Sequence, residues 1–165
     1  MLELFHNDMS TCSQKVRLAL AEKELDWKGH YLNLRAGDQQ KPDYIKLNPN
    51  AVVPTLLDDG KVLIESTVIN EYLDDAYPEH PLRPEDAYEG VRMRLWTKQL
   101  DEGVHAATGV LSTGIAFRYQ KLAQGPEALE SMLKKMPDPG KRERSREGIT
   151  KGVEASFFPP AIPWT

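Results

Sequence analysis

The sequence predicts an α/β domain over residues 1–79, an all-helical domain over 85–154 and an apolar, proline-rich tail over 155–165. Strand and helix patterns alternate in the first part of the chain, and helical spacing of apolar residues prevails after it. Between them, residues 77–84 contain three prolines and no periodic pattern, which is typical of a linker. Alternating strands and helices indicate a sheet that is covered by helices on both faces.

The first strand and helix are expected over residues 2–6 and about 13–23. In the strand, Leu2, Leu4 and His6 fall on one face. The cluster 10–13 indicates the helix start, because its hydroxyl groups can accept bonds from the free N–H groups of a first turn. Residues at helical spacing then mark the inner side of the helix, at Cys12, Val16, Ala19 and Leu20.

The rest of the first domain follows in chain order. We expect a strand over 27–34, a loop over 35–40, a helix over 41–47, strands over 52–57 and 61–64, and a helix after 65–67. The helix over 41–47 stops before Asn48-Pro49, since a residue before proline avoids the helical region. Asp58-Asp59-Gly60 is strong hairpin-turn chemistry. In the last helix, four residues have the spacing to pack on a sheet, namely Val68, Ile69, Tyr72 and Leu73.

The second domain is predicted to be helical throughout. Residues 92–119 carry widely spaced apolar side chains, and 126–136 form a further short helix. Pro137 and Pro139 interrupt the chain, and 140–154 is charged with little apolar surface.

Composition narrows the class of protein. Of the 165 residues, 40% are hydrophobic and 28% are charged, which is ordinary for a soluble protein, and no apolar run approaches the ~18 residues of a membrane span. A net charge of -4 offers no electrostatic reason to expect nucleic acid. The single cysteine, Cys12, excludes an internal disulfide and a cysteine-built zinc site, and the four histidines lack metal-site spacing.

Three motifs of the first domain resemble those of cytosolic glutathione transferases. The first is the strand over 2–6 followed by residues 10–20. The second joins segments 47–50 and 53–56, and the third joins segments 63–66 and 69–73. They occur in the family's order and spacing over about residues 1–80. The resemblance implies a thioredoxin-like glutathione-binding domain and a helical domain, with glutathione as co-substrate, a small electrophile as second substrate, and a homodimer. A cytoplasmic location is expected from the composition and from residues 1–6, which lack the basic and apolar regions of a signal peptide.

The resemblance also assigns binding residues. It implies a cis Val53–Pro54 bond that leaves the backbone of Val53 to pair with the cysteinyl part of glutathione; without it, an ordinary trans proline would be expected. Ser66 and the helix end would receive the γ-glutamyl carboxylate and Glu65 its ammonium, although this pair is also a good helix cap. Lys41 matches a position that binds the glycyl carboxylate in some classes, but is equally an ordinary surface lysine.

One departure from the family concerns that carboxylate. Many relatives carry a basic residue just before the Val-Pro pair, where this chain has Val52. Lys41 or Gln39 would therefore have to hold the glycyl carboxylate alone.

The catalytic position has more than one candidate. Ser10 aligns with the catalytic serine of zeta- and theta-like classes, and Cys12 with the cysteine of beta-class enzymes. Either stands at a helix N-terminus, where a thiolate is favoured by the helix dipole and by hydrogen-bond donors. We rank Ser10 first, Cys12 second and Thr11 third. The purely structural alternative for Ser10 or Thr11 is a helix cap. For Cys12 it is a small buried apolar residue on the same face of the helix as Val16.

The expected function is activation of glutathione as a thiolate for attack on a small electrophile, by addition, dehalogenation, ether cleavage or isomerisation. The electrophile is expected near Met9, His105 and Phe117. Two other hypotheses are a reductase of disulfides or dehydroascorbate that uses Cys12, and a glutathione-binding protein without turnover. The second follows from the short helical domain, and from the run 13–17, which is similar to transferase-like proteins of doubtful activity.

The C-terminal part differs from the family. There the helical domain continues beyond residue 165 and contains a buried helix opened by a Ser/Thr-x-x-Asp box, which is missing after Gly125. A shifted reading frame, a premature stop or a natural short form would each explain this. In every case we expect exposed apolar faces along 92–119. We expect the tail, with Phe157, Phe158, Ile162 and Trp164, to be ordered and to pack on such a surface.

Overall fold

The computed structural model describes residues 1–136 and 138–155. By proximity of Cα atoms the chain divides into two compact units, Met1–Met93 and Arg94–Thr165. Residues 77–84 contain neither helix nor strand. The domain limits drawn from the sequence at this segment stay a prediction.

The first unit is built on a four-stranded mixed sheet. Its strands are β1 (Leu2–His6), β2 (Trp27–Tyr31), β3 (Thr55–Asp58) and β4 (Lys61–Ile64), in the order β2-β1-β3-β4. β1 is parallel to β2 and antiparallel to β3, and β3 and β4 form an antiparallel hairpin. The hairpin turns at Asp59 and Gly60, both with positive φ (46° and 81°), as the Asp-Gly pair predicted.

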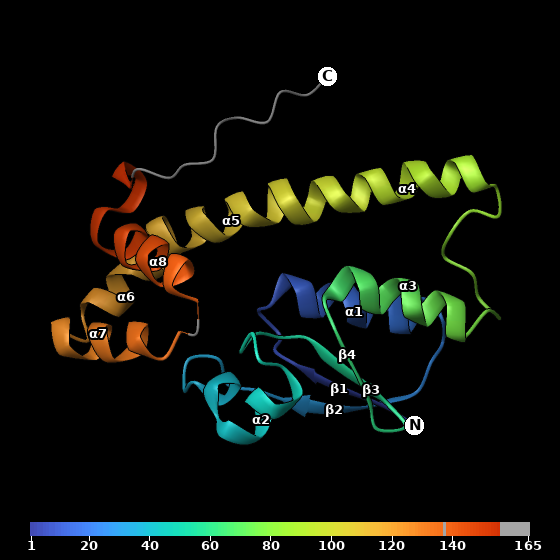
Figure 1. Ribbon diagram of the computed structural model, residues 1–165, viewed down its shortest axis with the longest axis horizontal. Coiled ribbons are helices and arrows are strands. Elements are labelled where there is room, and N and C mark those ends of the chain that lie inside the picture. The colour runs from blue at the N-terminus through green and yellow to red at the C-terminus, as the bar shows by residue number, and fades with distance from the viewer. Residues whose placement is uncertain (137, 156–165) are drawn as a thin grey trace. The chain divides into compact units, whose positions relative to one another are not determined.

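Helices lie on both faces of this sheet, as expected. α1 (Thr11–Glu22) and α3 (Ser66–Ala76) lie side by side on one face, and the short α2 (Pro42–Leu47) lies on the other, after a 3-10 turn, η1 (Asp38–Gln40) (Figure 1). Between the sheet and the helix pair is one buried apolar cluster, made of Leu2, Leu4, Val16, Ala19, Leu20, Leu56, Ile69 and Leu73. On the opposite face, the Phe5 ring lies 5.8 Å from that of Tyr44 in α2.

Four details differ from the sequence prediction. β2 ends at Tyr31 and not at residue 34, because the chain turns where Asn33 N–H binds Asp38. β3 begins at Thr55 and not at residue 52, since side chains and not a strand partner hold the carbonyl of Val52. On α1 the fully buried polar residue is Ser13, whereas Cys12 is half-buried. Val68, expected to face the sheet, is 57% exposed.

The second unit contains the end of a long helix and two shorter helices. The long helix runs through α4 (Ala87–Gln99), α5 (Ala106–Leu111) and α6 (Arg118–Leu122), joined by two π-helical stretches, η2 (Leu100–His105) and η3 (Ser112–Phe117). α7 (Pro126–Lys134), α8 (Pro139–Lys151) and a 3-10 turn, η4 (Gly152–Glu154), follow. Asp138 caps α8 by accepting bonds from the N–H groups of Gly140 and Lys141. The helical prediction for 92–119 is confirmed, and the helix predicted over 126–136 is confirmed as far as Lys134, where α7 ends.

Close packing in this unit is local. A Cβ on Gly114 of η3 would lie 3.3 Å from the backbone of Gly152, so the small residue allows the two segments to approach. Arg118 donates to the carbonyls of Ile149 and Thr150 at 3.2 and 2.9 Å, which satisfies acceptors at the end of α8. Among the described residues, no helix is both long and apolar enough to cross a membrane. The predicted tail lies outside the described residues, apart from Ala155.

Candidate functional site

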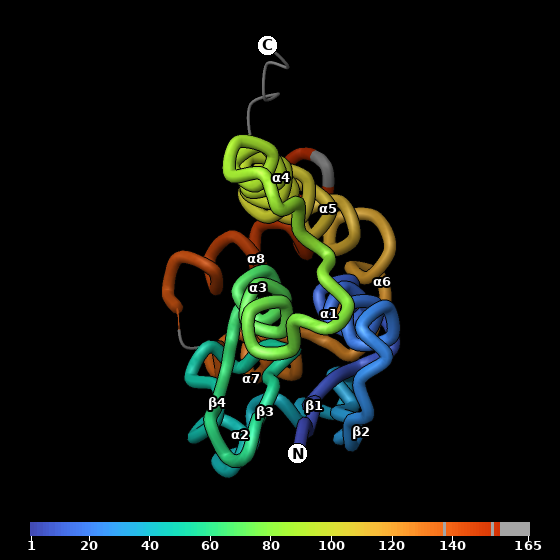
Figure 2. Tube along the Cα trace, turned by 90° about the vertical axis from the view of Figure 1, so that its right-hand side faces the viewer, coloured from blue at the N-terminus to red at the C-terminus, as the bar shows by residue number. Residues whose placement is uncertain are grey.

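Every predicted catalytic and glutathione-binding residue belongs to the first unit, and strand register brings most of them to one edge of its sheet, where β1 and β4 end and β3 begins. Thr55 of β3 is paired with Phe5 of β1 on one side and with Ile64 of β4 on the other. The segments that leave this edge are the turn to Ser10, the residues before Thr55, and the link to Ser66. Figure 2 shows the four strands side by side, with α1 and α3 together on one side of them. Because β1 and β4 end where β3 begins, residues about 45 positions apart in the chain gather at this edge.

Ser10 is the N-cap of α1. Its backbone is extended, and its Oγ accepts a hydrogen bond from Ser13 N–H at 3.2 Å. This bond uses a lone pair of the hydroxyl oxygen and leaves its O–H able to donate to another group. Ser10 therefore acts as the helix cap that the sequence suggested, and its capping bond is compatible with donation to a ligand.

Thr11 and Cys12 are the first two residues of α1. Thr11 is exposed, whereas Cys12 is half-buried. Cys12 lies two residues from Ser10, so both catalytic candidates of the sequence are at the same helix end. Their order as candidates stays a prediction.

The Val53–Pro54 bond is cis, as the resemblance implied. The preceding carbonyl, that of Val52, accepts bonds from Tyr44 Oη at 2.6 Å and from Asn48 Nδ2 at 2.9 Å. In a planar trans peptide the carbonyl and the N–H point in opposite directions. The N–H of Val53 therefore points away from Tyr44 and Asn48. Burial raises the pKa of Tyr44, which keeps its hydroxyl protonated and able to donate.

Glu65 and Ser66 form the start of α3. Glu65 has φ 69°, an uncommon value for a residue with a side chain, and its side chain makes no capping bond. Such outliers occur where the surrounding structure imposes them, often at functional sites. Ser66 is the first helical residue and is 7% exposed. The next residue, Thr67, accepts a bond from Lys15 Nζ at 2.6 Å, so α1 and α3 are tied together close to their N-termini.

Lys41 stands at the start of α2, but its side chain makes no capping bond. Its ammonium is 2.7 Å from Asp38 Oδ1, and the side chain is 69% exposed. The Lys41 ammonium, together with Asn33 N–H, holds the pKa of Asp38 below its usual value. Beside this pair, Gln39 Oε1 is a buried acceptor without a protein partner among the described residues.

Sequence reasoning missed three residues that shape this edge. Asn7 is 5% exposed and binds the turn before Ser10, while Tyr44 and Asn48 hold the carbonyl of Val52. Asn48 lies within the motif segment 47–50, which by itself assigns no role to this side chain. Asn7 follows the first strand and Asn48 precedes the third. An asparagine at such a position can bind neighbouring backbone groups, and this pattern could have indicated their role.

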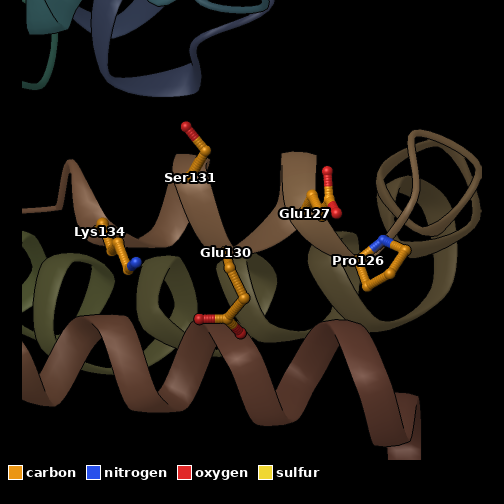
Figure 3. A pocket seen from close by; sticks show the side chains of 5 residues that line it. All are labelled: Pro126, Glu127, Glu130, Ser131 and Lys134. Atoms are coloured by element: carbon orange, nitrogen blue, oxygen red, sulfur yellow. The ribbon is translucent and has the colours of Figure 1, made fainter.

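The second unit has a surface hollow, which contains none of these residues. It is lined by Pro126, Glu127, Glu130, Ser131 and Lys134, all from α7 (Figure 3). Glu130 accepts two bonds from Arg146 of α8, at 3.1 and 2.9 Å. Its carboxylate is thus engaged in joining two helices, and the hollow contributes nothing to the site described above. The predicted electrophile neighbours Met9, His105 and Phe117 belong to different units and stay a prediction.

Comparison with known proteins agrees with this geometry. Residues 9–76 match the family model for the N-terminal domain of glutathione S-transferases. Protein LigF of Sphingobium sp. is 36% identical over 156 residues, covering 90% of this chain and 60% of LigF. Glutathione S-transferase Z2 of Arabidopsis thaliana is 43% identical over 88 residues, covering 53% of this chain and 40% of that protein. The matched part of the chain thus spans 60% of the length of LigF and 40% of the length of the Arabidopsis protein.

A solved structure extends the likeness to the fold. The crystal structure of the beta-etherase LigF from Sphingobium sp. superposes with a TM-score of 0.83 at 31% identity, covering 92% of this chain and 63% of that one. The predicted fold class, a thioredoxin-like domain followed by helices, is confirmed. The sheet-edge geometry, the family model and these relatives agree: residues 9–76 match the N-terminal domain of glutathione S-transferases, and the chain is similar to such proteins over most of its length.

Proposed function

We propose that this protein binds glutathione along the sheet edge and activates its thiol as a thiolate for attack on a small electrophile. The observation that carries the proposal is the register that sets Phe5, Thr55 and Ile64 in one row. It gathers two helix N-termini and a backbone N–H that points away from its neighbours. A peptide with two carboxylates and a thiol needs such donors, spaced along its length.

Ser10 would act on the thiol. The thiol of free glutathione has a pKa like that of cysteine, about 8.5, so a protein must favour the thiolate at neutral pH. The O–H of Ser10 can donate to the sulfur while its oxygen still caps α1. The N-terminal end of α1 adds a favourable dipole.

The remaining residues would bind the peptide. Val53 would pair through its backbone with the cysteinyl part, and the N-terminus of α3 with Ser66 would receive the γ-glutamyl carboxylate. Glu65 would meet the γ-glutamyl ammonium. Lys41 would receive the glycyl carboxylate, exchanging part of its contact with Asp38.

The reaction class follows from the relatives. The solved structure described above is that of the beta-etherase LigF. Displacement of an ether oxygen by a glutathione thiolate forms a carbon–sulfur bond and releases an alcohol or phenol after protonation. We therefore extend the proposal to ether cleavage, in a cytoplasmic homodimer.

Binding is tested by calorimetry with glutathione. Ser66→Ala and Glu65→Ala should each weaken binding by ~1–3 kcal/mol, the range for a charged group that loses a hydrogen bond. Val68→Ala, on the exposed side of the same helix, is the matched control and should leave the affinity unchanged. Equal affinities in all four proteins would remove Glu65 and Ser66 from the site.

Catalysis is tested by titrating the bound thiol spectroscopically and measuring turnover of a chromogenic electrophile. Ser10→Ala should raise the pKa of bound glutathione and lower kcat, with little change in Kd. Thr11→Ala tests the third candidate, and Leu18→Ala, on the exposed side of the same helix, is the control. A shift in Cys12→Ala alone would transfer the role to Cys12 and favour the reductase. Binding without turnover of any electrophile would favour a binding protein.

A further inference from the structure

Asn7 is the first residue after β1 and is almost fully buried, at 5% exposure. Neither the motifs nor the proposed function assign it a role. It lies three residues before Ser10, in the turn that joins β1 to α1. A buried amide at this point must satisfy its own donors and acceptor within the fold.

The side chain of Asn7 joins the turn to the end of β2. Nδ2 donates to the carbonyl of Leu32 at 2.8 Å and to Tyr31 Oη at 3.2 Å. Oδ1 accepts from Met9 N–H at 2.9 Å. The amide therefore ties residue 9, just before the helix cap, to a strand that is parallel to β1.

The backbone of Asn7 contacts the cap directly. Its carbonyl accepts from Ser10 N–H at 3.2 Å, and its N–H lies 3.4 Å from Ser13 Oγ as a donor. Ser13 N–H in turn donates to Ser10 Oγ. Asn7, Ser10 and Ser13 thus form a closed set of bonds, and the side chain of Asn7 anchors this set to β2.

We infer that Asn7 is a positioning residue that holds the hydroxyl of Ser10 where the glutathione thiol would lie. It acts through the turn and does not itself touch the ligand. The inference rests on the proposed function in one respect, that Ser10 acts on the thiol. The placement of the hydroxyl can be tested without any ligand.

The main variant is Asn7→Asp in the full chain. It keeps the size of the side chain and an acceptor for Met9 N–H, but sets an oxygen against the carbonyl of Leu32. Asn7→Ser is the second variant, since its hydroxyl can still serve the turn but is too short to reach β2. Tyr31→Phe is the control, because it removes only the longer of the two Nδ2 contacts.

The ligand-free measurement is amide hydrogen exchange within α1. Ser13 N–H, which donates to Ser10 Oγ, should exchange several-fold faster in Asn7→Asp and Asn7→Ser, while Leu20 N–H, buried in the same helix, should keep its rate. Tyr31→Phe should change neither amide. Equal acceleration of both amides, or of neither, would overturn the inference, because Asn7 would then act on global stability or on nothing.

The second measurement is the thiol titration with bound glutathione. Asn7→Asp should raise the pKa of the bound thiol by at least half of the rise seen in Ser10→Ala. Adding Asn7→Asp to Ser10→Ala should cause no further rise. A further rise of the same size would show that Asn7 acts independently of Ser10, and so contradict the inference. If the unmodified protein does not bind glutathione, the proposed function fails, whereas the exchange rates still decide the role of Asn7.

Discussion

The two units differ in how much apolar surface they bury. The first has a contiguous core of eight residues, each at most 5% exposed, between a sheet and two helices. Among its described residues, the second has a core of three buried residues, Leu129, Leu133 and Ile149, with Met132 and Met136 packed against them. Along its long helix, large apolar side chains are 39–67% exposed, namely Leu95, Trp96, Leu100, Val104, Leu111, Ile115, Phe117, Tyr119 and Leu122.

The difference lies in whether the apolar faces of a unit are covered by other elements of the same unit. A sheet and the helices on it can satisfy one another, because each apolar face finds its complement in the same 76 residues or so. The expectation of exposed apolar faces along 92–119 is confirmed. Patches of this kind are typical of surfaces that meet another protein or segment.

The units also differ in how deeply their ion pairs are buried. In the first, Lys23 is fully buried and its ammonium is 2.8 Å from Asp74 Oδ1 and 2.7 Å from the carbonyl of His80. Asp74 also accepts from the N–H groups of Leu82 and Arg83. This pair attaches residues 80–83 to α1 and α3. In the described part of the second unit, the ion pair of Arg146 with Glu130 is more exposed, with side chains 34% and 47% exposed.

The largest effect is expected from Lys23→Met. It removes the nearer counter-ion of the buried Asp74 carboxylate and leaves only Arg83, at 3.6 Å, so the loss should approach the ~3–5 kcal/mol of unfolding free energy that breaking a buried pair costs. Arg146→Gln, the matched break of an exposed pair, should cost much less. Urea unfolding measures both. Equal losses would contradict the contrast between a buried and a surface pair, and Lys23→Met combined with Asp74→Leu should recover part of the loss.

The next effect compares the two cores. Leu56 and Leu133 are both fully buried, and Leu→Ala at either should cost about 2–5 kcal/mol. We expect the larger cost for Leu56, because the tightly surrounded site in the first unit can relax less. Hydrogen exchange resolves the losses by unit. A larger loss from Leu133→Ala would mean that the second unit is the better packed of the two.

Low pH should reduce the unfolding free energy of the first unit, because Asp74 becomes protonated. Burial alone would raise the pKa of this carboxyl, but the bonds from Lys23 and the two backbone N–H groups outweigh it and hold the pKa below its usual value. The ionised Asp74 therefore stabilises the fold fully above about pH 3.9, the ordinary pKa of an aspartate in the unfolded chain. This stabilisation is lost as the pH falls through the lower pKa that Asp74 has in the folded protein. Unfolding curves at decreasing pH should show this loss. Asp74→Asn should lack it, and an equal acid sensitivity in that variant would assign the loss to other groups.

The smallest effect is expected on the exposed apolar face. Leu100 is 49% exposed, so Leu100→Gln should change the unfolding free energy by no more than about 0.5 kcal/mol. Leu133→Ala in the same unit is the buried reference. A large loss from Leu100→Gln at micromolar concentration, together with a lower mass by light scattering, would show that a second copy covers this face in solution.

Most elements of the fold could be predicted because they follow from local chemistry. β1 and β4 were predicted at their observed limits, and α1 and α3 begin at the capping clusters around Ser10 and Glu65. The errors fall where distant side chains decide the backbone. β3 starts late because Tyr44 and Asn48 bind the carbonyl of Val52, and Val68 faces outward because Ile69 and Leu73 occupy the position toward the sheet.

The sequence by itself determined the order of elements, the hairpin turn, the family motifs and the residues proposed to bind glutathione. Only the tertiary structure decided that Lys23 is buried and that Asn7 supports the cap of α1. A lysine or an asparagine carries no local signal of burial, because its cost of leaving water depends on partners found only in the folded chain. For Lys23 that partner is Asp74, 51 positions away, and for Asn7 it is the carbonyl of Leu32, 25 positions away.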